Sequence, residues 1–205
     1  MGNLSRQLFL CLLFILCNQT LVKAGDIERL QKMLDTQKRS NPLDLPNHDF
    51  RAQSFDAQET LSFVNSNFQN GNFSGTVDNP KQINNINFSE CNLENADFSY
   101  CIMTHCKFND AQLKGVKFEG STIKFTSFRR AVMPEANLNL TQQESVGYDE
   151  ANITCSTWVG ADLFRVSFTR TDERGMDKTD LKERDCSHEY AVTTGLFDSF
   201  SCKKK

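Results

Sequence analysis

Between residues 83 and 168, a large apolar side chain recurs at every fifth position. These centre positions are Ile83, Phe88, Leu93, Phe98, Met103, Phe108, Leu113, Phe118, Ile123, Phe128, Met133, Leu138, Tyr148, Ile153, Trp158, Leu163 and Phe168. The one polar member of the series is Gln143. A period of five fits neither a helix, with 3.6 residues per turn, nor a strand, with a period of two. It predicts a chain that turns a corner every five residues and returns over itself, which is a solenoid.

A second, smaller set of side chains lies two residues before the centres. It consists of Ile86, Cys91, Ala96, Cys101, Cys106, Ala111, Val116, Ser121, Thr126, Ala131, Ala136, Thr141, Val146, Ala151, Ser156, Ala161 and Val166. Quintets such as Cys91-Asn92-Leu93 and Ala96-Asp97-Phe98 resemble the consensus A-(D/N)-L-X-X of the pentapeptide-repeat family. The resemblance is strong over residues 83–168 and weaker over 61–73. It implies an all-β solenoid, a right-handed four-sided β-helix with one quintet on each side.

With four quintets to a coil, residues twenty apart should stack in one interior column. The core is then expected to be defined by Phe88, Leu93, Phe98, Phe108, Leu113, Phe118, Phe128, Leu138, Trp158, Leu163 and Phe168. Small residues should fill the corners, because four large centres already occupy each layer at close to crystalline density. Gln143 is expected to turn outward at a local bulge, because burying an unpaired amide is costly.

The two ends of the repeat carry different patterns. Asp26 to Gln37 places Ile27, Leu30 and Leu34 on one helical face. In the family, a short N-terminal helix commonly covers the open end of the coil, whose strand edge would otherwise pair with other chains. After Phe168 the apolar centres cease. The expected organisation is a signal peptide over 1–24, an N-terminal helix and linker over 25–44, irregular leading coils over 45–82, the pentapeptide-repeat β-helix over 83–168, and a non-repeat C-terminal cap over 169–205.

The first 24 residues have the pattern of a secretory signal. Arg6 supplies a positive charge, and the apolar run from Leu8 to Cys17 is too short to span a bilayer as a helix. Val22-Lys23-Ala24 is compatible with cleavage after Ala24. The sequence therefore predicts an exported protein without a membrane anchor after cleavage. Because the family is mainly bacterial, the expected location is the periplasm or beyond the cell.

Cleavage would change the charge and the cysteine count. It removes Arg6 and Lys23 and no acidic residue, so 23 basic residues fall to 21 against 26 acidic ones, a net charge of −5. That balance argues against a nucleic-acid binder. Of eight cysteines, six remain, which suits an oxidising compartment. The expected states are buried thiols at Cys91, Cys101 and Cys106, a disulfide between Cys186 and Cys202, and an outward Cys155 with no assigned partner.

The sequence offers little support for catalysis. It contains three histidines and none of the common protease, hydrolase, phosphate-loop or dinucleotide motifs. Cys101 and Cys106 should point inward and His105 outward, so these three cannot converge on a metal. A hydrolase based on His188 and Asp185 has no organised motif behind it. We therefore expect no enzyme activity, no catalytic residues, no metal and no cofactor.

Four Asn-X-Ser/Thr sequons occur after the signal segment. They lie at Asn72, Asn87, Asn139 and Asn152. Three of them, all but Asn139, follow from the repeat itself, which favours Asn before the centre and Ser or Thr after it. The sequons are therefore interpreted mainly as a by-product of the repeat rather than as glycosylation sites.

The function expected from these patterns is that of an exported, non-enzymatic interaction or scaffold module. Its partner is expected to be another protein, and self-association through the coil ends is a further option. The alternative comes from the family resemblance, because some cytoplasmic members mimic duplex DNA and bind a topoisomerase such as gyrase. The signal segment, the modest charge and the basic end Lys203-Lys204-Lys205 weaken this alternative.

Overall fold

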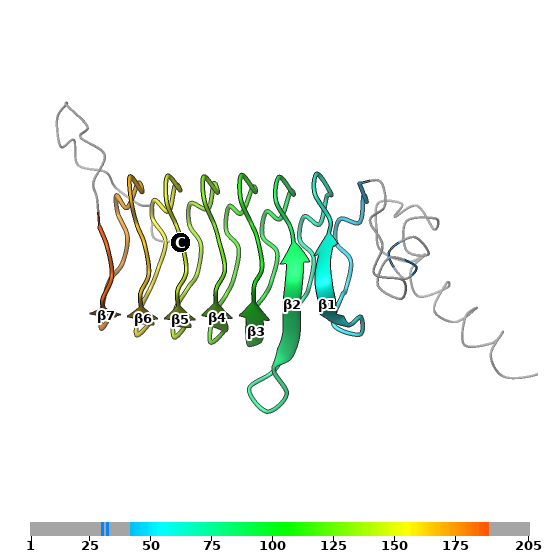
Figure 1. Cartoon of the computed structure of the whole chain (residues 1–205), viewed down its shortest axis with the longest axis horizontal. Helices are drawn as coiled ribbons and strands as arrows, with labels where there is room; N and C mark the ends of the chain where they lie inside the picture. The colour runs from blue at the N-terminus through cyan, green and yellow to red at the C-terminus, as the bar shows by residue number, and fades with distance from the viewer. Residues whose placement is uncertain (1–29, 31, 33–41, 189–205) are drawn as a thin grey trace, which may run out of the picture.

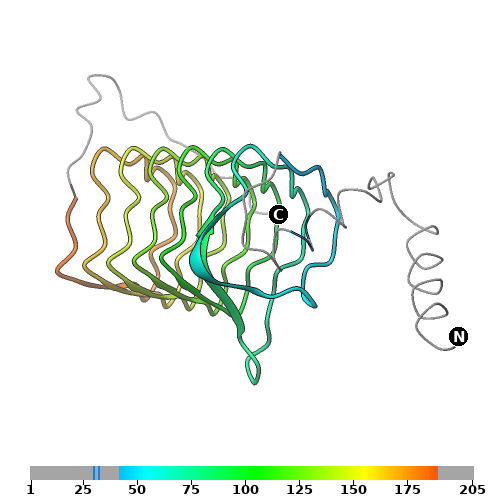
Figure 2. The same ribbon diagram turned by 45° about the vertical axis from the view of Figure 1, so that its right-hand side comes forward.

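The computed structural model describes Leu30, Lys32 and residues 42–188. The described chain winds into a rod of stacked coils (Figures 1 and 2). One side of the rod is a parallel sheet of seven strands in chain order. The strands are β1 (Phe55–Ser62), β2 (Lys81–Asn87), β3 (Cys101–Thr104), β4 (Thr122–Lys124), β5 (Gln142–Glu144), β6 (Asp162–Phe164) and β7 (Lys182–Arg184).

The register of the sheet sets the length of a coil. Met103 in β3 lies opposite Ile123 in β4, which in turn lies opposite Gln143 in β5, so the coil repeats every 20 residues. The other three sides of each coil pair through single parallel bridges. Between one pair of coils these bridges are Asn87 to Lys107, Asn92 to Gln112 and Asp97 to Lys117. The all-β, four-sided solenoid predicted from the sequence is confirmed.

The corners explain how a five-residue repeat folds. From Asn85 to Asp185 every fifth residue has a positive φ, between 50° and 70°. Many of these turns are closed by a backbone bond of the kind in which Ala96 N donates to Leu93 O at 3.0 Å. The residue before the centre supports the turn, since Ser99 N donates to Asp97 Oδ1 at 2.9 Å. The preference of the repeat for Asn or Asp before the centre is therefore explained by this support of the turn.

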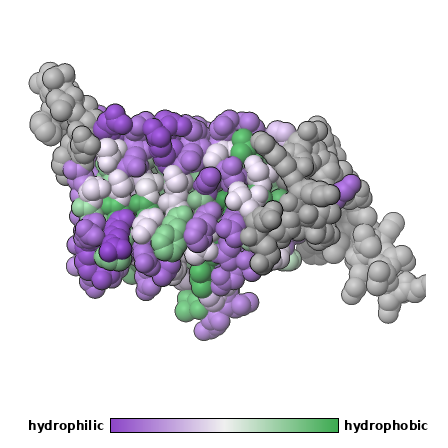
Figure 3. Space-filling view, in the orientation of Figure 1, coloured by the Kyte–Doolittle hydropathy of each residue, from purple (hydrophilic) through white to green (hydrophobic). Residues whose placement is uncertain are grey.

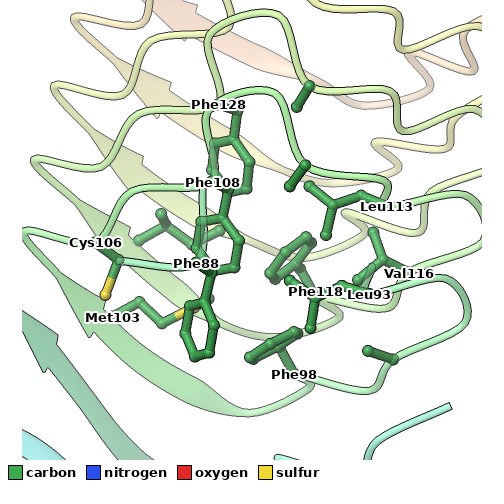
Figure 4. Packing of buried hydrophobic residues seen from close by; sticks show 14 of the residues in the cluster. Phe88, Leu93, Phe98, Met103, Cys106, Phe108, Leu113, Val116, Phe118 and Phe128 are labelled. Carbon is green, nitrogen blue, oxygen red and sulfur yellow. The ribbon is translucent and has the colours of Figure 1, made fainter. Parts of the chain in front are cut away.

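The interior is filled by columns of large side chains, as Figure 4 shows for Phe88, Phe108 and Phe128. That column continues through Tyr148 to Phe168, and its successive rings stack with centroids 4.9–5.4 Å apart. The residues expected to define the core are all buried, with exposed fractions of 0–1%. Columns of this kind bury apolar area in every layer, which is the main favourable term in folding.

The leading coils are longer than the later ones. Bridges join Asp49 to Asn72 and Asn72 to Asp97, so these coils repeat at 23 and 25 residues. The pairing of β1 with β2 shifts register between Asp56 and Leu61, which absorbs extra residues in β1. The loop 74–80 projects from the rod before β2 (Figures 1 and 2). The aromatic stacking is nevertheless continuous, because the ring of Phe73 stacks on that of Phe98 at 4.6 Å.

The prediction for Gln143 is wrong. Its side chain points into the core and is 3% exposed. Gln143 Nε2 donates to Thr141 Oγ1 at 3.1 Å, and the Tyr148 hydroxyl donates to Gln143 Oε1 at 3.0 Å. The amide is tolerated in the interior because two neighbouring polar groups pair with it, which removes most of the cost of burial. No bulge is needed, and β5 keeps the register of β4 and β6.

The repeat also continues beyond Phe168, where the sequence predicted its end. Residues 169–188 form a further coil that includes β7 and the bridge from Ser167 to Ser187. Its four centres form a charged end layer, defined as Glu173, Lys178, Glu183 and His188. The corners and bridges are backbone features, so they persist without apolar centres. Within the described residues this terminal layer has a coil on one side only, so it is not enclosed as the interior layers are.

Several expected features lie outside the described residues. They include the signal segment 1–24, most of the linker 25–44, and residues 189–205 with Cys202 and the basic end. Of the expected N-terminal helix, Leu30 and Lys32 are described; both are helical, and Leu30 is buried. Within the described part of the chain, no helix has the length and apolar character needed to cross a membrane.

Candidate interaction surface

The cysteine–histidine cluster lies as the repeat predicts, on two sides of the backbone. The Cys101 and Cys106 thiols point inward and donate to the carbonyls of Phe73 and Ile83, each at 3.2 Å. Burial raises the pKa of both thiols to about 12, so they stay protonated. His105 points outward and stacks on Phe125. In the described residues, no group of three or more His, Cys, Asp or Glu could hold a metal ion.

The other cysteines correct a prediction. Cys186 carries a free thiol, so the predicted bridge between Cys186 and Cys202 is not formed in this structure. Cys186 occupies the small inward position two residues before His188, in the same column as Cys106, and its Sγ faces the Leu163 carbonyl at 3.8 Å. Cys155, in contrast, is disulfide-bonded.

The two residues of the hydrolase interpretation do not face each other. The ring of His188 stacks on Phe168 at 4.8 Å and lies between two carboxylates, Glu173 at 3.2 Å and Glu183 at 3.3 Å. Asp185 instead accepts a bond from Arg165 Nε at 3.2 Å. His188 thus belongs to the charged end layer that closes the aromatic column.

The sequon asparagines serve the turns. The Oδ1 atoms of Asn72, Asn87 and Asn152 each accept a bond from the backbone N–H two residues on, at 3.0–3.1 Å. Asn139 Oδ1 accepts from Val159 N in the next coil at 2.8 Å. These side chains therefore have structural partners, as the interpretation from the repeat expects.

One side of the rod differs from the others in its outward residues. We call it the sheet face, defined as the outward side chains of β3–β7 together with the corner residue after each strand. Its corner residues are His105, Phe125, Ser145, Arg165 and Asp185. The rings of His105 and Phe125 stack at 5.2 Å, and Phe125 remains 49% exposed. Pale and deep green patches interrupt the hydrophilic surface of the rod in Figure 3.

Phe164 forms the second aromatic group of the sheet face. The Arg165 guanidinium lies 4.7 Å and the Arg184 guanidinium 5.5 Å from its ring centroid. Each of these arginines also pairs with an acid, Arg165 with Asp185 at 3.2 Å and Arg184 with Asp162 at 2.8 Å. The cations are thereby held over the ring, and the charge on this part of the face is nearly balanced.

A shallow hollow of about 210 Å³ lies between these groups. It is lined by Lys124, Gln142, Gln143, Glu144, Asp162, Phe164 and Arg184. Pockets for drug-sized ligands usually have volumes of about 300–1,000 Å³. The hollow is therefore of a size to receive a side chain of a partner protein rather than a separate small substrate.

The other sides of the rod are mostly polar, with Val132 and Leu140 as exposed apolar residues. On the corner that follows the side of Phe108 and Phe128, charges alternate along the rod. Arg130 pairs with Asp110 at 2.7 Å, and Arg170 pairs with Glu150 at 2.9 Å. Exposed ion pairs of this kind contribute little to stability and are largely screened by salt. The sheet face differs from this corner because it combines exposed aromatic rings with cationic groups that lie over one of them.

Sequence reasoning missed the sheet face. It treated the outward positions as generally polar, although a signal was present. Phe125 lies two residues after the centre Ile123, and Phe164 lies one after Leu163, so both aromatic residues fall outside the inward phase. An aromatic residue at such an outward position is a candidate for contact with a partner.

The geometry places the chain in the class of parallel β-solenoids built from five-residue sides. Residues 49–138 match the family model described as a pentapeptide repeat region.

Several solved structures are similar to this chain. One is QnrB1, described as a plasmid-mediated fluoroquinolone resistance protein, at 16% identity over 72% of this chain and 92% of that chain, with a TM-score of 0.32. Another is a pentapeptide repeat protein from the Arabidopsis thaliana thylakoid lumen, at 22% identity over 49% and 79%, with a TM-score of 0.29. A third is Rfr23 from the cyanobacterium Cyanothece 51142, at 12% identity over 80% and 95%, with a TM-score of 0.27. No curated protein matches the chain.

Proposed function

We propose that this protein is an exported, non-enzymatic interaction module that binds another protein through its sheet face. The observation that carries the proposal is the aromatic group of the sheet face, in which Phe125 is 49% exposed, has a φ of 50° and stacks on the ring of His105 at 5.2 Å. An ordinary L-residue in this left-handed region costs roughly 1–2 kcal/mol. Asn85 occupies the equivalent corner two coils earlier and is a residue that tolerates this conformation. An exposed aromatic group of this kind, rather than a single apolar residue, is accounted for by a contact with a partner.

The groups around Phe125 suit a protein partner. Interface centres are enriched in aromatic residues and arginine, and the sheet face offers Phe125, Phe164, Arg165 and Arg184. The hollow beside Phe164 could receive one anchoring side chain. Because most charges on this face are already paired, apolar contact and shape would supply most of the affinity, and salt would affect it only weakly.

Export is supported by two observations of different kinds. The first 24 residues have the pattern of a secretory signal. The disulfide at Cys155 suits an oxidising compartment. The alternative, mimicry of DNA toward a topoisomerase such as gyrase, would need a long run of unneutralised acids. On the described corner that includes Asp110 and Glu150, arginines alternate with the acids, which favours the first proposal.

The test begins with a photoreactive phenylalanine at position 125, placed in the full chain and exported by its own cells. A second chain carries the same group at position 132, where Val132 is 36% exposed on the opposite side of the rod. We expect a specific cross-linked protein from position 125 only. The same fractionation locates the chain, and retention in the cytosol would overturn the export part of the proposal and favour the topoisomerase alternative.

Binding of the cross-linked partner is then measured with matched variants. Phe125→Asn should weaken binding about 30-fold, the loss expected for an aromatic hot spot. Val132→Asn is the control, because it also removes apolar surface and Asn152 fills the equivalent position one coil later. Equal affinity of Phe125→Asn and the unchanged protein would refute the role of the sheet face.

A further inference from the structure

The hollow in the sheet face has an ordered arrangement of charges. It is formed by side chains of the four neighbouring strands β4 to β7 (Figure 1). The charged residues that line it are Lys124 on β4, Glu144 on β5, Asp162 on β6 and Arg184 on β7. Across the strands their signs are therefore positive, negative, negative and positive. The two carboxylates lie in the middle of the hollow, and one cation lies at each end.

The two carboxylates start from neighbouring strands, whereas the two cations do not. Glu144 lies opposite Phe164, which is two residues along the same strand from Asp162. Neighbouring strands are about 4.8 Å apart, so the strands of Lys124 and Arg184, three steps from each other, are separated by about 14 Å. A single group of a ligand can therefore reach both carboxylates more readily than both cations.

Each carboxylate also keeps part of its capacity to accept hydrogen bonds. Glu144 Oε2 accepts from Lys124 Nζ, and Asp162 Oδ1 accepts from Arg184 Nη2, each at 2.8 Å. Among the described residues, the second oxygen of each carboxylate accepts no hydrogen bond. Lys182, which lies opposite Asp162 on β7, does not line the hollow. The middle of the hollow therefore offers acceptors to a donor that carries a positive charge.

We infer that the hollow recognises the guanidinium group of an arginine side chain of the partner protein. A guanidinium presents five N–H donors in one plane, so it can donate to Glu144 and Asp162 together, whereas a lysine ammonium is a compact point charge. The ring of Phe164 is an apolar wall on which the aliphatic stem of an arginine can pack. The inference rests on the proposed function, because Lys124 at the rim is followed by Phe125 and one partner would cover both.

The first test uses small probes in place of the partner. The exported full-length protein, labelled with an NMR-active nitrogen isotope, is titrated with Nα-acetyl-arginine methylamide, with its citrulline analogue and with its glutamate analogue. We expect saturable shifts of the backbone amides of β5 and β6 with the arginine probe at millimolar concentration. The citrulline probe has a similar shape without the charge, so it should bind about tenfold more weakly. Equal binding of these two probes, preference for the glutamate probe, or no shift of these amides would overturn the inference.

Variants then identify the groups that bind the arginine probe. Glu144→Gln and Asp162→Asn should each weaken its binding about tenfold. Lys124→Met should strengthen it, because this change releases the Glu144 carboxylate. The control is Glu135→Gln, which removes an exposed acid that pairs with Lys114 at 3.8 Å outside the hollow. A dispersed amide spectrum shows that each variant is folded. Unchanged binding by Glu144→Gln, or weaker binding by Lys124→Met, would show that the carboxylates are not the ligands.

The outcome can be separated from that of the proposed function. A specific cross-link from position 125 without binding of the arginine probe would overturn this inference and leave the proposed function in place. Binding of the probe without any cross-link would contradict the proposed function and leave the hollow as a guanidinium site. Where both succeed, Glu144→Gln should also weaken binding of the captured protein about tenfold. Equal affinity of that protein for Glu144→Gln and for the unchanged chain would refute the assignment of its arginine to the hollow.

Discussion

Replacing Tyr148 with Phe removes one hydroxyl from the core and leaves the ring stack with Phe128 and Phe168 in place. That hydroxyl donates to Gln143 Oε1 at 3.0 Å, and Gln143 is 3% exposed, so water has little access to the acceptor. A buried group left without its partner costs about 1–3 kcal/mol. We therefore expect Tyr148→Phe to lower the free energy of unfolding by about that amount, although it deletes a single oxygen atom.

The reciprocal change completes a double-mutant cycle. Gln143→Leu removes the acceptor and leaves the buried Tyr148 hydroxyl without its partner, at a similar cost of about 1–3 kcal/mol. The double variant removes both polar groups. An apolar side chain fits the position, because Ile123 and Leu163 occupy it in the coils on either side. Replacing both partners by apolar groups can be nearly neutral, so the two changes should couple by about 2 kcal/mol or more.

The assay is urea unfolding followed by circular dichroism and by the fluorescence of Trp158. The Trp158 ring lies 5.2 Å from that of Tyr148, so its emission reports on the layer that is changed. All four proteins of the cycle should show the same denaturant slope, which would confirm that they expose the same surface on unfolding. Additive losses in the double variant would refute the reasoning. Such a result would mean that Gln143 is solvated, as the bulge predicted from the sequence requires.

Three further predictions test other parts of the rod. Leu113→Asp or Phe118→Asp should unfold the rod, because the new carboxylate has neither water nor a partner in the core. The controls Lys114→Asp and Lys117→Asp lie on the exposed surface and should change the free energy of unfolding by about 0.5 kcal/mol or less. Equally mild effects of all four, measured by thermal unfolding, would contradict the inward phase. Lys81→Met should lower the free energy of unfolding by about 1–3 kcal/mol, because Lys81 Nζ donates to the carbonyls of Phe50 and Gln53 at 2.6 and 2.8 Å. The control is Lys107→Met at an exposed position. An equal loss for both variants in urea unfolding would contradict this role of Lys81. Burial lowers the pKa of His48, whose Nε2 has no hydrogen-bond partner in the described structure, so the unfolded state binds its proton more readily. Stability should therefore be full above about pH 6.5 and fall as the pH decreases below it, and His48→Ala should flatten this slope in unfolding curves; an unchanged slope would exclude His48 as the cause.

The interior of the rod was the part most open to prediction from the sequence. A side chain such as Phe108 must meet Phe88 and Phe128 in every layer, so the choice of residue at each centre is narrow and its period is visible. The same argument fails at Gln143, because its burial depends on the hydroxyls of Thr141 and Tyr148 in three dimensions. A rule that treats each centre separately cannot recognise such a pair.

The end of the repeat was misplaced for a related reason. The prediction followed apolar centres, and these cease after Phe168. The backbone, however, is held by its corners and bridges, and Asp180 and Asp185 still adopt the positive φ of the earlier corners. The continued coil brings Cys186 into the inward column of Cys106 rather than onto a cap. The predicted Cys186–Cys202 bridge was wrong because it depended on a change of fold that does not occur.

The sheet face consists of outward positions, whose residues the repeat does not fix. Inward and corner-supporting positions are constrained by packing and by turns, so their residues say little about function. Outward positions carry no such constraint, and polar residues satisfy them at no cost to folding. Phe125 and Phe164 depart from that default on the same side of the rod, and Arg165 and Arg184 lie over the ring of Phe164. In a solenoid of this kind, the candidates for a binding function are the outward residues that folding does not require.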